Sequence, residues 1–171
     1  VMSELLRGMR LSKSFRGRRG GAPVVAVNDV SFSIDAGECL ALVGESGSGK
    51  STIARMLVGL EVPDSGALVM NGRDRLTGRR GRASRLGRAR EVQMVFQDPY
   101  GSLDRRLTVR ESLELAMRLH RLGTRGEIRG RAAALLDEVR LESRLADSKP
   151  HQLSGGQRQR VAIARALAVQ P

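Results

Sequence analysis

The sequence predicts an α/β fold in which strands come first and helices follow. Two observations indicate this fold. An apolar run at residues 39–43 leads directly into a glycine-rich loop and a helical segment, and helix-forming segments dominate the chain after residue 98. The chain has 171 residues, which is enough for a single domain with a substantial core.

Five segments are expected to be strands: residues 4–15, 24–34, 39–43, 67–70 and 92–96. In the second of them, Val30, Phe32 and Ile34 alternate with polar residues, which is the period of a half-buried strand. The third, Cys39–Val43, is apolar throughout, as expected of a parallel strand covered on both faces. An Asn-Gly pair after the fourth predicts a tight turn.

Five segments are expected to be helices: residues 52–60, 109–120, 127–139, 142–146 and the chain from 156 or 157 onward. The last of these carries an apolar side formed by Val161, Ile163, Ala164 and Leu167. Residues 73–90 are polar and lack a clear period, which predicts an exposed loop with some helix.

The chain is strongly basic, with a formal net charge of +12. Such a charge can bind nucleic acid or anionic lipid, or it can belong to an ordinary solvated surface. The arginines are spread along the chain and no aromatic residues are interleaved with them to stack bases, which favours the solvated surface.

Cysteine content and hydropathy exclude two classes of protein. The lone Cys39 cannot form an internal disulfide, so a disulfide-stabilised secreted domain is excluded. No run approaches the ~18–20 apolar residues that cross a bilayer, and no signal-peptide pattern is present. We therefore expect a soluble chain in a reducing compartment.

A phosphate-binding P-loop follows the apolar run at 39–43. It comprises Gly44, Glu45, Ser46, Gly47, Ser48, Gly49, Lys50, Ser51 and Thr52. Glycines let backbone N–H groups turn inward around phosphates, Lys50 would bridge the β- and γ-phosphate oxygens, and Ser51 would ligate Mg²⁺. Only three of the 30 basic residues are lysines, so a lysine at this position carries weight.

A second anion site of different design occurs about a hundred residues later. It comprises Leu153, Ser154, Gly155, Gly156 and Gln157, which form a turn leading into a helix whose free N–H groups suit an anion. Two such sites suggest that one serves the nucleotide of this chain and the other the nucleotide of a partner.

The P-loop, Gln97 at the end of a strand, and Leu153–Gln157 together resemble the ATP-binding-cassette (ABC) ATPases, over essentially the whole chain. The resemblance implies a P-loop NTPase core with an N-terminal antiparallel β subdomain and a helical signature subdomain, incomplete at the C-terminus. The implied parts are residues 1–97 for the nucleotide-binding core, 98–156 for the helical subdomain and 157–171 for the signature helix.

The same resemblance implies how the site works. Two cassettes pack head to tail around two ATP molecules, and Leu153–Gln157 of each contacts the γ-phosphate of the partner's ATP. Gln97 would touch Mg²⁺ and the attacking water and relay closure to a transmembrane subunit, so Lys50 and Gln97 are the expected catalytic residues. Phe15, at the end of the first strand, is the matching candidate for stacking on adenine.

The segments 44–49, 97–103 and 157–160 are similar to the dipeptide/oligopeptide importer branch of the family. Nickel and glutathione importers share much of the same sequence pattern. Asp104-Arg105 departs from the usual continuation of that branch.

The implied partners are a second ABC subunit, in a homo- or heterodimer, permease subunits and an extracytoplasmic solute-binding protein. The implied location is peripheral, at the cytoplasmic face of the membrane, with no nucleic acid partner. A soluble ABC ATPase acting on nucleic acid remains an alternative.

Residues 133–138 have the form of a Walker B motif, but they precede the signature and lie in a run of helix formers. Asp137 and Glu138 are therefore expected on a solvated helix face. The resemblance implies that the true Walker B strand, with the catalytic Glu, begins just after Pro171. The intact protein is then expected to hydrolyse ATP, whereas for residues 1–171 alone a fragment that only binds nucleotide remains an alternative.

His120 and His151 have no plausible ligand partners, so no metal site other than that of Mg²⁺ is expected.

Overall fold

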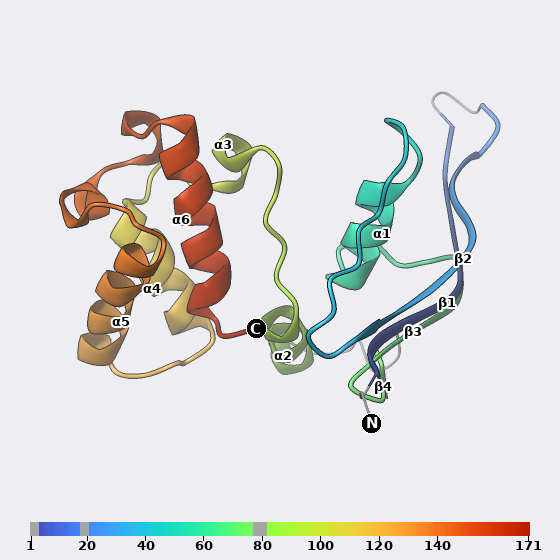
Figure 1. Cartoon of the computed structure of the whole chain (residues 1–171), viewed down its shortest axis with the longest axis horizontal. Helices are drawn as coiled ribbons and strands as arrows, with labels where there is room; N and C mark the ends of the chain where they lie inside the picture. Colours follow the sequence, from blue (N-terminus) through green and yellow to red (C-terminus); the bar gives the residue numbers. More distant parts are fainter. Residues whose placement is uncertain (1–3, 18–20, 77–81) are drawn as a thin grey trace. The chain divides into compact units, whose positions relative to one another are not determined.

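A computed structural model describes residues 4–17, 21–76 and 82–171 of the chain (Figure 1). The chain divides into two compact units, residues 1–89 and residues 90–171, and each is described by itself. We call them unit 1 and unit 2.

Unit 1 is built on an antiparallel sheet with the strand order β2-β1-β3-β4. The strands are β1 (Glu4–Phe15), β2 (Val24–Asp35), β3 (Ser65–Met70) and β4 (Arg73–Asp74). The strands predicted at 4–15, 24–34 and 67–70 are confirmed. The Asn-Gly turn is confirmed as well, because Asn71 and Gly72 have the positive φ angles of 48° and 70° that such a hairpin turn requires.

One helix, α1 (Lys50–Leu57), covers a face of this sheet. It buries Thr52, Ile53 and Met56, and the sheet contributes the fully buried Leu11 and Leu68 to the same core. Burial of the apolar side chains among these residues stabilises the unit. The helix predicted from residue 52 is confirmed and starts two residues earlier.

Two predicted strands are absent. The segments 39–43 and 92–96 form no strand and belong to no sheet in the described residues. A strand is held by hydrogen bonds to a neighbouring strand, and within the described residues neither segment has such a neighbour. High strand propensity alone is therefore not sufficient to form a strand here. The first segment is exposed throughout, and Val43 reaches 92% exposure.

The polar segment 73–90 was predicted to be an exposed loop with some helix, and the helix is confirmed. It contains β4 and the helix α2 (Arg82–Glu91), while part of the prediction, residues 77–81, lies outside the described residues. The expectation of exposure is wrong for Arg75, which is only 6% exposed. Its guanidinium donates to the Met70 sulfur at 3.2 Å and to the Arg88 carbonyl at 3.2 Å, so it joins the sheet to α2.

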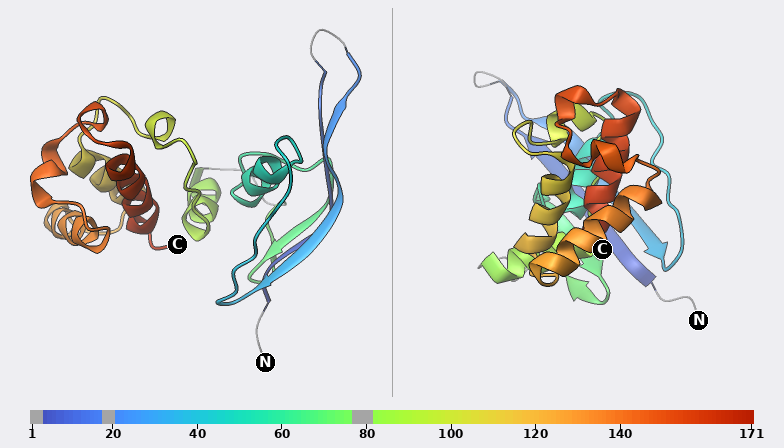
Figure 2. Two further views of the ribbon diagram at one scale, coloured as in Figure 1. Left: turned by 45° about the horizontal axis from the view of Figure 1, so that its top comes forward. Right: turned by 90° about the vertical axis from the view of Figure 1, so that its left-hand side faces the viewer.

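Unit 2 is helical. Its elements are α3 (Pro99–Ser102), α4 (Val109–Leu119), α5 (Arg125–Glu138), the 3-10 turns η2 (Ser143–Asp147) and η3 (Pro150–Gln152), and α6 (Gly155–Ala168). Helices α4, α5 and α6 pack side by side around one apolar core (Figures 1 and 2). The fully buried Leu113, Met117, Ala132 and Ala164 lie in that core. All four helical segments predicted after residue 98 are therefore confirmed, the short one as a 3-10 turn.

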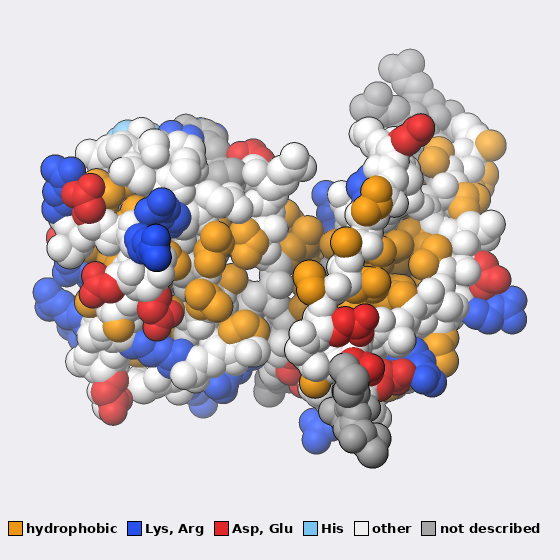
Figure 3. All heavy atoms as spheres, viewed as in Figure 1, with side chains coloured by type: hydrophobic (Ala, Val, Ile, Leu, Met, Phe, Trp, Pro, Cys, Tyr) orange, Lys and Arg blue, Asp and Glu red, His pale blue; other side chains and the backbone are white. Residues whose placement is uncertain are grey.

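Hydrophobic side chains also remain at the surface of both units (Figure 3). Among them are Leu40 and Leu42 of the unpaired segment in unit 1, and Ile163 and Leu167 on α6 in unit 2. Among the described helices, none is both long enough and apolar enough to cross a membrane.

Candidate functional site

The P-loop connects the unpaired segment 39–43 to the start of α1. Gly49 caps this helix with φ of 91°, a left-handed conformation that favours glycine. A Cβ added at Gly49 would lie 2.1 Å from the Ala26 carbonyl oxygen of β2. Glycine is therefore required here by the chain itself, because the loop passes against the backbone of β2.

The N-terminus of α1 has no side-chain cap within the described part of the chain. The first N–H groups of a helix otherwise find a capping side chain, water or a ligand. An uncapped terminus behind a glycine-rich loop has the donor groups and the partial positive charge that suit a phosphate.

Lys50 lies folded over the P-loop. Its ammonium donates to the Gly44 carbonyl at 2.8 Å, to the Glu45 carbonyl at 2.6 Å and to the Ser48 hydroxyl at 3.3 Å. The cation is thus held at the centre of the loop by three oxygens, which phosphate oxygens can replace. The next side chain, the hydroxyl of Ser51, is exposed and could serve as an oxygen ligand for Mg²⁺.

The signature turn, Leu153–Gln157, lies in unit 2 at the start of α6. Ser154 is the N-cap: its hydroxyl accepts from the Gln157 N–H at 3.2 Å, and the Gln157 side-chain oxygen accepts from the Ser154 N–H at 2.8 Å. This reciprocal capping box holds the turn rigidly. The Leu153 side chain is only 3% exposed and belongs to the core of unit 2, so it anchors the turn rather than facing solvent.

Arg158 lies in the segment 157–160 noted for its resemblance to the importer branch, but its role in fixing the chain that leads into the turn was not anticipated. Its guanidinium donates to the Pro150 carbonyl at 2.8 Å and to the Leu153 carbonyl at 2.7 Å. Both acceptors are backbone groups, so no pattern of side-chain types could have revealed these contacts.

The glycines of the signature turn differ from Gly49. A Cβ added at Gly155 or Gly156 would meet nothing within 4 Å in the described residues. Both residues lie in the first turn of α6 and are exposed. The fold of the described chain does not need glycine at either position, and the absence of a Cβ leaves the backbone there accessible.

The remaining predicted residues are placed as follows. Gln97 is exposed and follows the unpaired segment 92–96, two residues before α3. Asp137 and Glu138 lie on α5 and are exposed, which confirms the predicted solvated helix face. His120 caps the end of α4 and His151 lies in η3. Among the described residues, no group of three or more His, Cys, Asp or Glu could hold a metal ion.

Comparison with known proteins gives a consistent family. The profile of the ABC transporter family matches residues 27–171. The chain is 44% identical, over its whole length, to the oligopeptide transport ATP-binding protein OppF of Bacillus subtilis (strain 168), of which it covers 55%. It is 47% identical, over 85% of its length, to the nickel import ATP-binding protein NikE of Shigella boydii serotype 4 (strain Sb227), of which it covers 53%. It thus spans about half the length of the curated relatives it matches.

The fold also matches a solved structure. This is the dimeric structure of a post-hydrolysis state of the ATP-binding cassette MJ0796 bound to ADP and Pi, with a TM-score of 0.84 and 34% sequence identity. The match covers 98% of this chain and 71% of the other. It confirms the predicted α/β fold.

Proposed function

This chain belongs to the ABC transporter family, and on that premise we propose that it forms the nucleotide-binding part of an ATP-hydrolysing subunit of an importer. The observation that carries the proposal is the pair of glycine-rich loops, one with a central lysine and one capped by Ser154. Each loop precedes a helix N-terminus, the arrangement that binds phosphate.

The P-loop, Gly44–Thr52, would bind the phosphates of ATP. Lys50 would exchange the carbonyl oxygens of Gly44 and Glu45 for β- and γ-phosphate oxygens, and the Ser51 hydroxyl would hold Mg²⁺. Magnesium, when bound, neutralises charge that develops on the phosphates. Phe15 would stack on the adenine.

The signature turn would complete the site of a second ABC subunit. The Ser154 hydroxyl accepts from the Gln157 N–H, so its own O–H hydrogen is available to donate to a γ-phosphate oxygen. The exposed Gly155 and Gly156 would let that phosphate approach the backbone N–H groups of α6. The MJ0796 structure, similar to this chain, is dimeric by its description.

Coupling to transport would pass through Gln97, which is the last residue of the nucleotide-binding core, 1–97, and directly precedes the helical part, 98–156. We infer permease subunits and a solute-binding protein as partners, a peripheral position at the cytoplasmic face of the membrane, and peptide as the cargo, with nickel or glutathione as the alternative. The names of OppF and NikE support this choice.

The test uses the full-length protein. Lys50→Ala should abolish ATP binding or turnover, while Arg55→Ala, which removes an exposed cation from the last turn of α1, should not. Ser154→Arg should leave ATP binding to the monomer intact and block ATP-driven dimerisation, measured by light scattering. Thr124→Arg, which breaks the equivalent cap of α5, is the control for loss of a cap alone. Normal turnover by Lys50→Ala would overturn the P-loop assignment.

A further inference from the structure

Phe15 ends β1 close to the P-loop. It pairs with Val24 of β2, two residues from Ala26, whose carbonyl lies against Gly49. Two residues of a strand span about 7 Å and neighbouring strands lie about 5 Å apart. The ring is 36% exposed. Phe15 is therefore within reach of a nucleotide whose phosphates occupy the P-loop.

A paired bulge decides which face of β1 Phe15 belongs to. Between Gly8 and Leu11 strand β1 has one residue more than β2, and between Leu11 and Lys13 β2 has one more than β1. The extra residues of this pair coincide with Arg10 and Asp29, which have φ angles of 49° and 51°. A further shift between Lys13 and Ser14 adds a residue to β2 only, so it leaves the alternation of β1 toward Phe15 unchanged. Each bulge shifts the alternation of its strand by one residue, so Leu11 and Lys13, not Arg10, continue the buried face.

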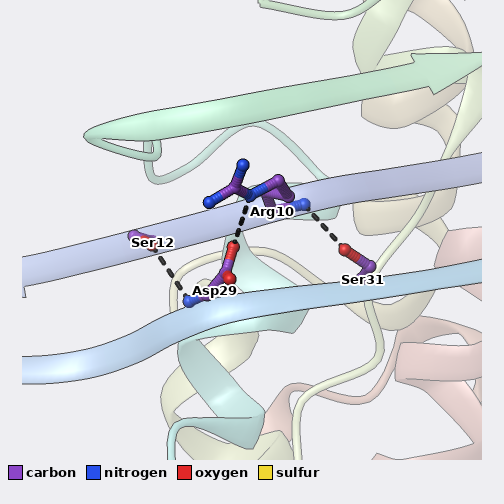
Figure 4. Close-up of polar contacts among 4 residues, drawn as sticks. All are labelled: Arg10, Ser12, Asp29 and Ser31. Carbon is purple, nitrogen blue, oxygen red and sulfur yellow. Dashed lines mark hydrogen bonds and ion pairs between the residues drawn. The ribbon is translucent and has the colours of Figure 1, made fainter.

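The paired bulge is held by reciprocal contacts across the two strands (Figure 4). The Arg10 N–H donates to the Ser31 hydroxyl at 2.8 Å, and the Asp29 N–H donates to the Ser12 hydroxyl at 3.0 Å. The Arg10 guanidinium also contacts the Asp29 carboxylate at 3.0 Å. These bonds satisfy the N–H groups that the bulge removes from the ladder. They also hold Lys13 and Phe15 on the same face of β1.

On that side Lys13 is held between a carboxylate and an aromatic ring. Its ammonium lies 2.9 Å from an Asp64 carboxylate oxygen and 5.6 Å from the centre of the Phe15 ring, over its face. The Lys13 side chain is only 15% exposed. Asp64 also accepts from the Ser14 N–H at 2.7 Å, and its own N–H donates to the Ser12 carbonyl at 2.8 Å. The bond from the Ser14 N–H, followed by that from Lys13, lowers the pKa of Asp64 below its usual range.

We propose that Lys13 is a positioning residue for nucleotide binding: its ammonium, anchored by Asp64, covers one face of the Phe15 ring and leaves the opposite face for the purine of the nucleotide. The inference rests on the proposed function. A cation on one face of a ring is attracted by its π electrons and restrains the ring, so less ordering remains to be done when a base stacks on the other face.

The identity of the residue supports this role. Lysine accounts for only three of the 30 basic residues, and one of the other two is Lys50 of the P-loop. A compact ammonium fits between Asp64 and the ring where the planar, forked guanidinium of arginine requires more room. The scarcity of lysine was the signal in the sequence that could have singled out this position.

The experiment compares two ligands on the full-length protein by titration calorimetry: Mg-ATP, which has a base, and inorganic tripolyphosphate, which has none. Lys13→Met keeps the length of the side chain and removes the charge. It should weaken ATP binding by about three- to tenfold and leave tripolyphosphate binding unchanged. Lys13→Arg should restore part of the loss, and Arg7→Met, which breaks an exposed ion pair on the same strand, should change neither ligand.

A double-mutant cycle with Phe15→Ala separates positioning from a structural role. Once the ring is gone, Lys13→Met should have no further effect on ATP affinity, since its contribution passes through the ring. Equal loss with and without the ring, or unchanged ATP affinity in Lys13→Met, would overturn the inference while the proposed function stands. If the unmodified protein binds neither ligand, both fall. Unchanged tripolyphosphate affinity also shows that the variants are folded.

Discussion

The two glycine-rich loops of this chain resemble each other in composition but differ in what makes glycine necessary. In the P-loop, Gly49 has a positive φ and no room for a Cβ beside the Ala26 carbonyl. In the signature turn, Gly155 and Gly156 have open space in front of them. The conformation of the first loop requires glycine. The second loop contains glycine although glycine lowers the stability of the helix that it begins.

The caps of the two helices differ in the same sense. Helix α1 has no side-chain cap in the described part of the chain, and Lys50 binds the loop oxygens instead. Helix α6 has a complete capping box from Ser154 and Gln157. The P-loop is therefore arranged to close around an anion, whereas the signature turn is a rigid surface presented to one. This difference agrees with the proposal that the signature turn binds the nucleotide of a partner.

The largest effect that this comparison predicts is that of Gly49→Ala. The new methyl group would meet the Ala26 carbonyl, and alanine at φ of 91° adds a cost of roughly 1–2 kcal/mol. We expect a loss of well over about 2 kcal/mol of stability and of ATP binding, measured by thermal melting and calorimetry.

Gly47→Ala is the matched control, because Gly47 has a similar φ of 87° but open space around its Cβ position. It should carry only the conformational cost. If both variants lost stability equally, the contact between the P-loop and β2 would not be what requires glycine at position 49.

The signature turn should respond in the opposite direction. Replacing Gly155 and Gly156 by alanine favours helix, by about 0.5–1 kcal/mol each. We expect an unchanged or higher melting temperature together with at least roughly tenfold weaker ATP-driven dimerisation, because the methyl groups keep the phosphate from the N–H groups. Gly126→Ala, at an open position in the first turn of α5, should stabilise without affecting dimerisation. Intact dimerisation of the double variant would remove the distinction between the two loops.

The sequence was sufficient for elements whose stability is local. The helices of unit 2 carry their own periodicity and caps, and the Asn71-Gly72 turn carries its own backbone preference, so all were predicted near their true positions. The segments 39–43 and 92–96 have the composition of strands, but pairing is a property of the neighbour and cannot be read from the segment.

The paired bulge could not be predicted for a different reason. Val30, Phe32 and Ile34 follow the alternation of a strand, but the shift at Asp29 depends on a matching shift at Arg10 in another strand. Arginine has no preference for positive φ, so the presence of Arg10 in the sequence does not indicate a bulge at that position. The P-loop and signature residues could be proposed from the sequence because the chemistry of phosphate binding restricts residue types at fixed spacing.

The smallest predicted effect concerns the N3 residue in the capping boxes of three α-helices, which is Glu111 in α4, Glu127 in α5 and Gln157 in α6. The N–H bond from Thr108 lowers the pKa of Glu111, and that from Thr124 lowers the pKa of Glu127. A carboxylate next to a bound phosphate would repel it, whereas the neutral amide of Gln157 makes the same cap without that charge.

Acid should therefore distinguish the three helices. Because the folded-state pKa values of Glu111 and Glu127 are lowered, their caps contribute fully above the ordinary glutamate value of 4.5 and lose this contribution as pH falls through the folded values. Hydrogen exchange, corrected for its intrinsic pH dependence, should show protection of the Thr108 and Thr124 amides falling below that pH and protection of the Ser154 amide staying constant. Gln157→Glu should make the protection of the Ser154 amide fall with pH in the same way, and it should weaken ATP-driven dimerisation at neutral pH. If protection of the Ser154 amide in the unmodified protein already fell together with that of Thr108 and Thr124, the neutral cap would not distinguish α6 from α4 and α5.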